Sequence, residues 1–310
     1  MDSGHYNANE YFKKTFGKKM FRLSLDGGMT CPNRDGSKGV GGCIFCSESG
    51  SGDFAAGRTF SVAEQIEVAK AQVVKKLPKN GAPYGYVAYF QSYTNTYASV
   101  TYLASLFRET IAHPEIEALF IGTRPDCLNE DVLDLLEDLA KTKPVYIELG
   151  LQTAKSASIA YINRCYDNSE FASAVTHLSA RNLPVIVHCI LGLPYETLED
   201  MKHTIDYVCS FPIHGIKLQL LHVLKGTGLA LDYEKLLADD AFALMDREAY
   251  LDAVCTLLKR IPKNIVIYRL TGDGPRRLLI APLWSTDKKK LQNDLYKKLK
   301  ESELPCNPNP

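Results

Sequence analysis

Short apolar runs alternate with helical patterns along most of this 310-residue chain. Strands are predicted at residues 20–25, 86–91, 118–122, 145–151, 185–191, 216–221 and 265–270. Helices are predicted at residues 61–77, 99–112, 129–141, 198–210 and 247–260, with further helical material up to residue 181. Runs such as VIVHCIL at 185–191 are apolar on both faces of the strand, which is typical of a sheet covered by helices. The pattern therefore indicates an α/β protein.

Strands and helices follow one another as repeated βα units, which implies parallel strands and a right-handed winding. With six or so units, the sheet is either a partial barrel or an open doubly wound sheet. In a barrel, catalytic residues lie at the carboxyl ends of the strands. The polar residues at the predicted strand ends are Gln91, Ser92, Tyr93, Thr123, Arg124, Glu148, Gln152, His222 and Lys225. We expect them on one rim, together with the loop after the first strand.

Composition adds few constraints. The chain is 45% apolar and 23% charged, which is ordinary for a globular protein, and its formal net charge is zero. Any basic surface for nucleic acid therefore has to be local. Residues 1–20 lack an apolar signal core, and no apolar run reaches the roughly 18 residues of a membrane span. We expect a cytoplasmic protein with no membrane partner, whose nine cysteines are ligands, catalysts or core residues.

Three cysteines stand together in the glycine-rich segment CPNRDGSKGVGGCIFC at residues 31–46. Cys31, Cys43 and Cys46 supply three thiolates, the usual ligands of iron–sulfur clusters, and the glycines let the backbone wrap around a bulky centre. Three buried thiols are the plain structural alternative, but buried cysteines rarely gather in a polar loop. A structural zinc site needs four ligands, and no fourth cysteine or histidine has suitable spacing. We therefore predict a [4Fe–4S] cluster with one iron open to a small ligand.

Several other polar residues leave two interpretations open. Glu148 lies in the otherwise apolar strand VYIELGLQ, where a carboxylate is costly without a partner, so a functional position is favoured. A site role and a structural role are equally supported for Arg124, His188, His222 and Lys225. A phosphate contact or a turn-closing role is open for Arg269, Asp273 and Arg276. No ligand-like spacing, and hence no second cluster, is found for Cys127, Cys165, Cys189, Cys209, Cys255 and Cys306.

Basic residues gather toward both ends of the chain. The C-terminal group consists of Lys288, Lys289, Lys290, Lys297, Lys298 and Lys300, and the N-terminal group of Lys13, Lys14, Lys18, Lys19 and Arg22. Each group is either a solvated surface or a contact to an RNA backbone. We divide the chain into an N-terminal extension (1–19), a barrel (20–284) and a basic helical tail with a proline-rich C-terminus (285–310).

The segments DGGMTCPNRDGSKGVGGCIFC, YFQSYTNTYA, IGTRPDCL, ELGLQT and HCILGLPYET follow one another in this order. With the cysteine loop and the βα repeats, they closely resemble the YtqA/YhcC family of radical SAM proteins, also called MnmL. Eleven residues separate Cys31 from Cys43, which departs from the common CxxxCxxC pattern and resembles the branch that includes the Elongator catalytic subunit. The resemblance covers residues 20 to about 225.

This resemblance implies a partial (β/α)6 radical SAM barrel with N-terminal and C-terminal extensions, and S-adenosylmethionine on the open iron of the cluster. Reductive cleavage of S-adenosylmethionine would release a 5′-deoxyadenosyl radical that abstracts a substrate hydrogen. The cofactor-binding residues that the family pattern implies are Phe45, Gln91, Ser92, Glu148, Gln152, Arg164, His188 and Gly192. Phe45 is expected beside the adenine, Arg164 at the methionine carboxylate, and His188 and Gly192 near the ribose and adenine. The segment YFQSYTNT replaces the usual GGE, so no residue is assigned to the methionine amino group.

The resemblance also implies a tRNA substrate, on which the carboxymethylaminomethyl group of the wobble uridine becomes aminomethyl on the way to 5-methylaminomethyl-2-thiouridine. The implied partners are tRNA, an electron donor such as flavodoxin or ferredoxin, and a downstream methyltransferase. Two alternatives stay open. One is a radical SAM enzyme that acts on a small molecule or a peptide, and the other is a non-catalytic iron–sulfur redox sensor or binding protein.

Overall fold

The computed structural model describes residues 5–50, 52, 53, 55, 57–238, 242, 244–272 and 274–301. Two residues discussed from the sequence, Asp273 and Cys306, lie outside the described residues, as do residues 1–4 and the proline-rich C-terminus. Among the residues that are described, no helix combines the length and the apolar character that a membrane span requires.

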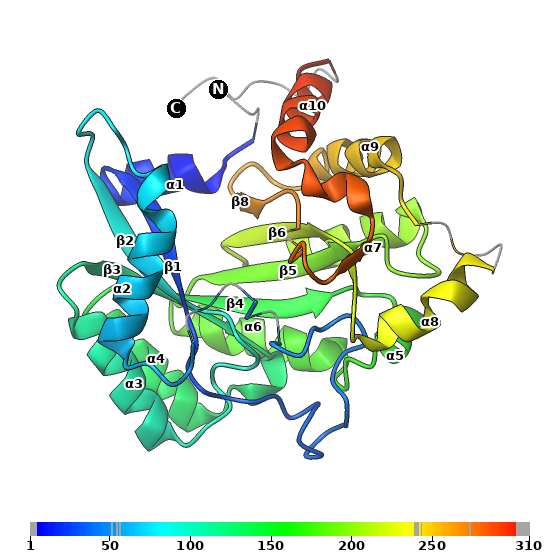
Figure 1. Ribbon diagram of the computed structural model, residues 1–310. Coiled ribbons are helices and arrows are strands. Elements are labelled where there is room, and N and C mark those ends of the chain that lie inside the picture. Colours follow the sequence, from blue (N-terminus) through cyan, green and yellow to red (C-terminus); the bar gives the residue numbers. More distant parts are fainter. Residues whose placement is uncertain are drawn as a thin grey trace.

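Seven parallel strands form one curled sheet, the partial barrel that the sequence predicted (Figure 1). In sheet order they are β1 (Lys19–Leu25), β2 (Tyr84–Phe90), β3 (Ile116–Thr123), β4 (Val145–Gln152), β5 (Val185–Leu191), β6 (Gly215–Leu220) and β8 (Val266–Arg269). The order in the sheet follows the order in the chain, because successive βα units wind in one direction. The carboxyl ends of all seven strands therefore lie on one side of the barrel.

Helices cover the outer face of the sheet. They are α2 (Val62–Val73), α3 (Val100–Ala112), α4 (Glu130–Ala140), α6 (Asn168–Ala180), α7 (Leu198–Cys209) and α9 (Arg247–Leu258). Ser61 and Glu64 form the capping box that their spacing predicts at the start of α2. Side chains such as Leu103 of α3 and Leu133 of α4 are fully buried in the main core between the helices and the sheet. Short 3-10 turns lie at Val74–Lys76, Pro125–Cys127 and Leu283–Thr286.

The first helix, α1 (Ala8–Phe16), closes the amino-terminal end of the barrel. It contacts both edge strands, β1 and β8, and the amide of Ile267 donates to the carbonyl of Tyr6 at 2.8 Å. Phe12 packs against the ring of Phe120, and the hydroxyls of Tyr11 and Tyr146 are 2.6 Å apart. These aromatic contacts fill the barrel interior at the amino ends of the strands. The space left for a ligand therefore lies toward the carboxyl ends.

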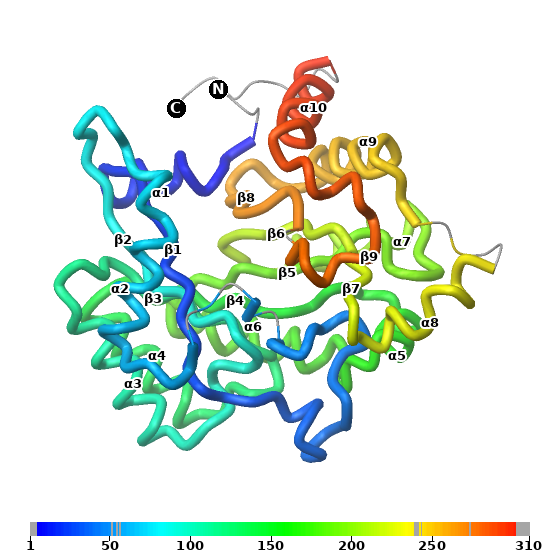
Figure 2. The backbone as a smooth tube through the Cα atoms, viewed as in Figure 1, coloured from blue at the N-terminus to red at the C-terminus, as the bar shows by residue number. Residues whose placement is uncertain are grey.

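The remaining elements lie outside the main sheet and its covering helices, and of these the sequence predicted the helix of the lysine-rich tail and helical material before residue 181. Strand β7 (Val223–Leu224) pairs in antiparallel fashion with β9 (Leu279–Ala281), outside the main sheet (Figure 2). Helix α8 (Gly228–Leu237) follows β7, and the short helix α5 (Ser156–Tyr161) follows β4. The lysine-rich segment forms α10 (Lys288–Glu301), which contacts α9 and buries its leucines in the main core. The predicted domain boundaries remain predictions.

Candidate cofactor-binding site

A cavity of about 280 Å³ lies at the carboxyl ends of the strands. Its walls include Gln91 after β2, Thr123 at the end of β3, Gln152 at the end of β4 and Leu220 at the end of β6. The loop that follows β1 forms another wall. Most of the polar strand-end residues therefore meet on one rim, as expected for a barrel.

The loop after β1 carries the three predicted cluster ligands. Cys31, Cys43 and Cys46 all line the cavity and are half-buried. Thiolates are the usual ligands of iron–sulfur clusters, and a structural zinc site needs a fourth ligand. The set of three thiols on this loop therefore fits an iron–sulfur cluster better than a single zinc ion.

Neighbouring side chains hold this loop in place. Asn33 Nδ2 lies 3.6 Å from the sulfur of Cys43, and Arg34 Nη2 donates to the carbonyl of Cys46 at 3.2 Å. Gly42 has a φ of +83°, and a Cβ at this position would lie 2.8 Å from the Arg34 side chain. Both the backbone conformation and the available space therefore require glycine here.

Arg124 approaches the cysteine loop from the end of β3. Its Nη1 lies 4.0 Å from the sulfur of Cys31 and donates to the carbonyl of Arg164 at 3.0 Å. Its Nε and Nη2 donate to the carboxylate of Asp126 at 2.9 and 2.8 Å. The guanidinium also lies 4.7 Å from the ring centroid of Tyr166. Arg124 thus places a permanent positive charge beside a predicted cluster ligand.

Five of the predicted cofactor-binding residues line the cavity, namely Phe45, Gln91, Glu148, Gln152 and His188. The Nε2 atom of Gln91 is buried and has no hydrogen-bond partner among the described residues, so it is available to a ligand. Gln152 has a φ of +65°, which is uncommon for a residue other than glycine, and its Oε1 accepts from the Tyr166 hydroxyl at 3.3 Å. Their contacts to a cofactor remain predictions.

Two further predicted residues, Ser92 and Gly192, do not line the cavity. Ser92 is buried, and a Cβ on Gly52 would lie 2.0 Å from its hydroxyl oxygen, so the serine packs directly under that segment. Gly192 has a φ of +79°, and a Cβ there would lie 3.0 Å from the sulfur of Met245. Both residues support the site from behind its walls.

Arg164 also lies outside the cavity wall and is fully buried. Its guanidinium nitrogens donate to the carbonyls of Leu151, Thr153 and Tyr166 and to the side chain of Asn168. Every nitrogen therefore has a protein partner, and the side chain ties the end of β4 to the start of α6. This geometry does not favour the predicted contact to a methionine carboxylate.

Below the rim, the barrel interior holds a cluster of ionisable side chains. Glu148 on β4 is 1% exposed, and its Oε2 accepts from the ammonium of Lys217 on β6. The same oxygen lies 2.7 Å from Nε2 of His188 on β5, and Arg22 Nη1 on β1 lies 3.4 Å from the other oxygen. Burial alone raises the pKa of Glu148, but the charges of Lys217 and Arg22 outweigh it and hold the pKa well below its usual value. Glu148 is therefore an ionised carboxylate with several partners.

His188 completes this cluster as a neutral imidazole. Burial and the nearby charge of Lys217 lower the pKa of His188 to about 4. Its Nδ1 accepts from Gln219 Nε2 at 3.0 Å, so its Nε2 carries the proton that is donated to Glu148. Lys217 and Gln219 were not predicted as site residues. A lysine in the apolar strand GIKLQL is nevertheless the same signal that pointed to Glu148.

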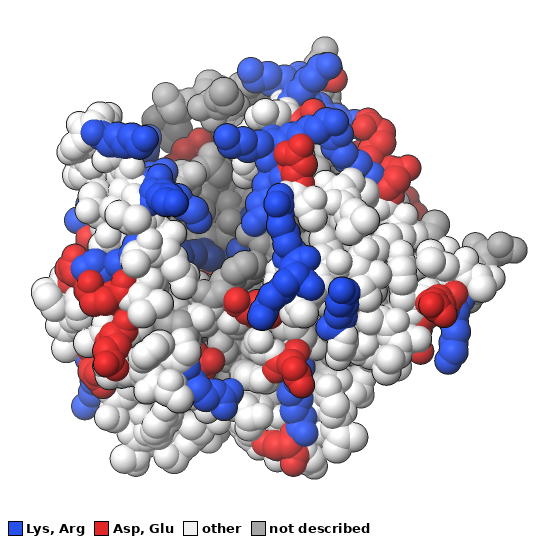
Figure 3. Space-filling view, viewed as in Figure 1, with Lys and Arg blue, Asp and Glu red and all other residues white. Residues whose placement is uncertain are grey.

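Basic side chains gather beside the cavity mouth. On the face shown in Figure 3, Lys and Arg side chains cover α10 and continue over the segment between β8 and β9. Arg276 and Lys288 line a small hollow that shares Gly274 with the main cavity. The Arg277 side chain is 72% exposed, and Lys289 is exposed on α10. The C-terminal basic group therefore reaches the mouth.

The N-terminal basic group does not flank the mouth in the same way. Arg22 points into the barrel toward Glu148, and Lys18 forms an ion pair with Glu117 at 2.7 Å. Lys13 belongs to α1, which lies at the opposite end of the strands from the cysteine loop (Figure 1). The expectation of two basic groups around one site is therefore met only by the C-terminal group.

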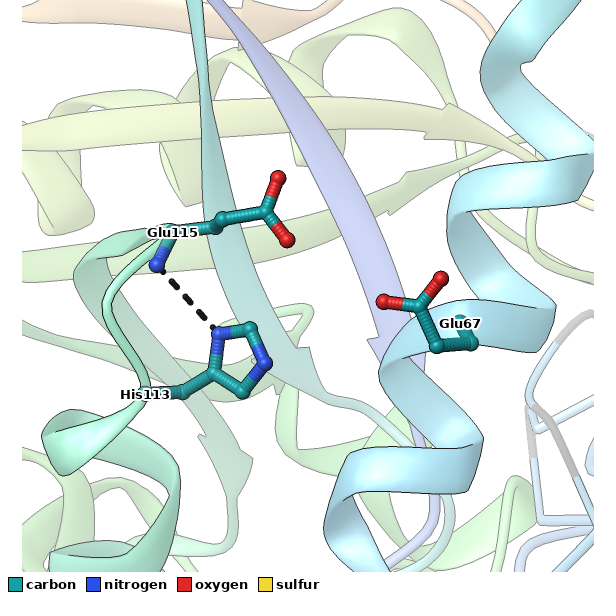
Figure 4. A group of neighbouring side chains, drawn as sticks. All are labelled: Glu67, His113 and Glu115. Atoms are coloured by element: carbon teal, nitrogen blue, oxygen red, sulfur yellow. Dashed lines mark hydrogen bonds between the residues drawn. The ribbon is translucent and has the colours of Figure 1, made fainter.

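Glu67, His113 and Glu115 form a second group of possible metal ligands, on the outer surface (Figure 4). The ammonium of Lys70 lies 2.9 Å from the carboxylate of Glu67 and 2.5 Å from that of Glu115. The ring Nδ1 of His113 accepts from the Glu115 amide at 3.3 Å. Lys70 thus already pairs with both carboxylates and compensates one of their two charges, so the group needs no metal ion to explain it.

Both halves of the chain match known protein families. Residues 31–208 match the radical SAM superfamily, and residues 213–301 match the radical SAM C-terminal domain. The chain is 39% identical over 295 residues to YtqA of Bacillus subtilis (strain 168), which covers 95% of this chain and 89% of YtqA. It is 35% identical over 272 residues to YhcC of Escherichia coli (strain K12), which covers 87% of this chain and 84% of YhcC.

The fold is similar to a solved structure of the archaeal Methanocaldococcus infernus Elp3 with an N-terminal deletion. The TM-score is 0.68 at 16% identity, over 93% of this chain and 64% of that chain. At this identity the likeness shows the fold alone. Radical SAM proteins use a [4Fe–4S] cluster and S-adenosylmethionine, and the thiol donor set described above fits that cluster. The chain belongs to the radical SAM superfamily and, within it, to the YtqA/YhcC family.

Proposed function

We propose that this radical SAM enzyme modifies the wobble uridine of tRNA and converts its carboxymethylaminomethyl group to aminomethyl. The family resemblance of the sequence motifs points to this substrate. One observation supports the proposal, which is that the three-cysteine loop, the predicted cluster ligand, and a basic surface meet at the mouth of one cavity. A radical formed at the cluster would act on whichever group enters this mouth.

The cavity residues suggest how the cofactors are held. Cys31, Cys43 and Cys46 would bind the [4Fe–4S] cluster. The cluster and S-adenosylmethionine, when bound and reduced, would supply a 5′-deoxyadenosyl radical. Abstraction of a hydrogen from the carboxymethyl carbon, return of one electron to the cluster and addition of water would then leave the aminomethyl group and release the two-carbon fragment as glyoxylate. Phe45 would pack against the adenine, and Gln91 would donate to S-adenosylmethionine, which would give its buried amide the partner it lacks. Gln152, on the same rim, would be a further polar contact.

The surface beside the mouth suits an RNA backbone. Arg276, Arg277 and Lys288 would bind phosphates, with an affinity that falls as the salt concentration rises. The target uridine has to leave its stack to reach the radical. Tyr93 lines the cavity, and its ring would be a stacking surface for the base. A flavodoxin or ferredoxin would supply the electron, and a methyltransferase would act on the aminomethyl product.

An anaerobic assay on purified protein with a reconstituted cluster tests this function. The reaction contains S-adenosylmethionine, dithionite and bulk tRNA from a strain that lacks this protein. Mass spectrometry then follows 5′-deoxyadenosine and the modified nucleosides. We expect 5′-deoxyadenosine together with a shift from carboxymethylaminomethyluridine to aminomethyluridine.

Two other outcomes would redirect the assignment. Formation of 5′-deoxyadenosine with unchanged tRNA nucleosides would contradict the tRNA substrate and favour a small molecule or a peptide. No 5′-deoxyadenosine from an iron-replete sample would contradict turnover itself and favour a redox sensor or binding protein. Heat-denatured protein with the same tRNA serves as the control for nonenzymatic change.

A further inference from the structure

The inner part of the cavity, away from its mouth and inside the barrel, carries more positive than negative charge. Lys217 and Arg269 both line the cavity, and Arg22 reaches the same interior from β1. Glu148 is the carboxylate that pairs with Lys217 and Arg22, and His188 is neutral for the reason given above. Three basic side chains thus face one carboxylate. Such an excess is unfavourable in a buried site unless an anion is bound there.

Arg269 differs from the other two cations, because no carboxylate of the described residues pairs with it. Lys217 and Arg269 are paired residues on the neighbouring strands β6 and β8, so their side chains face the same interior. Burial is the main cause that lowers the pKa of Lys217 and of His188, and the charge of Arg269 lowers both further, in keeping with its place beside them in the cavity. A planar guanidinium in this position is suited to bind a carboxylate in bidentate fashion.

The group formed by Glu148, His188 and Lys217 lies deeper in the cavity than Gln152 at the rim. Glu148 precedes Gln152, the last residue of β4, by four residues, and Lys217 precedes Leu220, the last residue of β6, by three. A ligand group that reaches Lys217 from the mouth has to be narrow and extended. A carboxymethylaminomethyl substituent is an unbranched chain that ends in a carboxylate.

We propose that Arg269 and Lys217 form a carboxylate-binding subsite that holds the end of the carboxymethylaminomethyl group below the radical. This inference rests on the proposed function and adds to it how the substrate is chosen. The subsite would hold the substituent extended, with its methylene groups between the carboxylate contact and the cofactor. It would also reject a wobble substituent that lacks the negative charge, because the basic side chains would then stay uncompensated.

A charge-neutral substrate tests the subsite directly. Two synthetic anticodon stem-loops are compared, one with the carboxymethylaminomethyl group and one with its methyl ester, in the wild-type enzyme and in Arg269→Gln. For the wild type we expect a preference for the carboxylate on the order of 30-fold or more in kcat/KM, as for loss of one buried charged contact. Arg269→Gln should lose most of this preference, and Arg269→Lys should keep part of it. Arg260→Gln, which removes a surface ion pair with Asp206, is the matched control and should keep all of it.

The preference ratio separates a binding role from a structural one, because misfolding lowers the rates on both RNAs equally. Equal loss on both RNAs in Arg269→Gln, or a wild-type enzyme that does not distinguish them, would overturn the subsite and leave the tRNA function in place. A wild-type enzyme that cleaves S-adenosylmethionine but leaves the carboxylate RNA unchanged would overturn the proposed function and this inference with it. Iron content and thermal unfolding of each variant show whether the fold is intact.

Discussion

The imidazole Nε2 of His188 lies 2.7 Å from Oε2 of Glu148 and joins β5 to β4 inside the barrel. Lys217 from β6 and Arg22 from β1 reach the same carboxylate. Strands β1 and β6 are not neighbours in the sheet, so Glu148 connects strands across the curled interior. The carboxylate of Glu148 therefore links the strands β1, β4, β5 and β6 that line the cavity.

This position makes Glu148 important for stability. Glu148→Gln should lower the free energy of unfolding by about 3–5 kcal/mol, because it leaves the buried ammonium of Lys217 without its counter-ion. Anaerobic urea unfolding measures the change. Glu137→Gln removes a carboxylate that pairs with Arg181 at the surface and should cost about 1 kcal/mol or less. Equal effects of the two substitutions would contradict the account of the interior cluster.

His214 lies at the end of the barrel that α1 closes, and its burial makes the free energy of unfolding depend on pH. Burial lowers the pKa of His214 from 6.5 to about 4. Between these values the unfolded chain binds a proton that the folded protein does not, so stability falls as the pH drops through this window. His214→Gln should lose less stability than the wild type between pH 7 and pH 5, by on the order of 1–2 kcal/mol. The check is urea unfolding at both pH values, and identical losses would exclude this role.

Arg124 should tune the reduction potential of the cluster. Its guanidinium lies 4.0 Å from the sulfur of Cys31, where a positive charge favours the reduced, more negative cluster. Arg124→Gln should therefore lower the midpoint potential, on the order of tens of millivolts. Redox titration monitored by electron paramagnetic resonance measures this value. Arg108→Gln, at a surface ion pair with Asp138, should leave it unchanged, and an unchanged potential in both variants would refute the assignment.

Only the three loop cysteines should be needed for the cluster. Cys31→Ala, Cys43→Ala and Cys46→Ala should each lose most of the bound iron and sulfide, because thiolates are the ligands. Cys127→Ala is a matched control, since burial raises the pKa of the Cys127 thiol to about 12 and keeps it protonated. Iron and acid-labile sulfide analysis after anaerobic reconstitution gives the result. Loss of iron in Cys127→Ala, or its retention in Cys43→Ala, would show that the ligand set is wrong.

Local patterns predicted much of this fold. The alternation of apolar runs with helical segments predicted seven strands and their parallel direction. It left a partial barrel and a doubly wound sheet open, and the family resemblance pointed to the partial barrel. The cysteine loop was visible because its ligands are close in sequence. The closure of the barrel by α1 was not visible, because it depends on contacts between residues such as Phe12 and Phe120 that are far apart in the chain.

The ionisable group around Glu148 also depends on contacts between residues that are far apart in the chain. Glu148 was recognised from its apolar surroundings, but its partner Lys217 lies 69 residues away and two strands further along the sheet. Arg164 illustrates the opposite case, because the family resemblance assigned this charged residue to a ligand contact. Its donors are instead occupied by backbone carbonyls at the end of β4, which no spacing rule reveals. Charge alone therefore did not distinguish a binding residue from a structural one.

Transfer of deuterium from substrate to cofactor tests the central claim most directly. An anticodon stem-loop whose carboxymethylaminomethyl group is deuterated at its methylene carbons is incubated anaerobically with the reduced holoenzyme and S-adenosylmethionine. The account predicts 5′-deoxyadenosine that contains deuterium, formed together with aminomethyluridine. If 5′-deoxyadenosine contains no deuterium while the RNA is converted, the radical does not act on this group, and the proposed route is wrong.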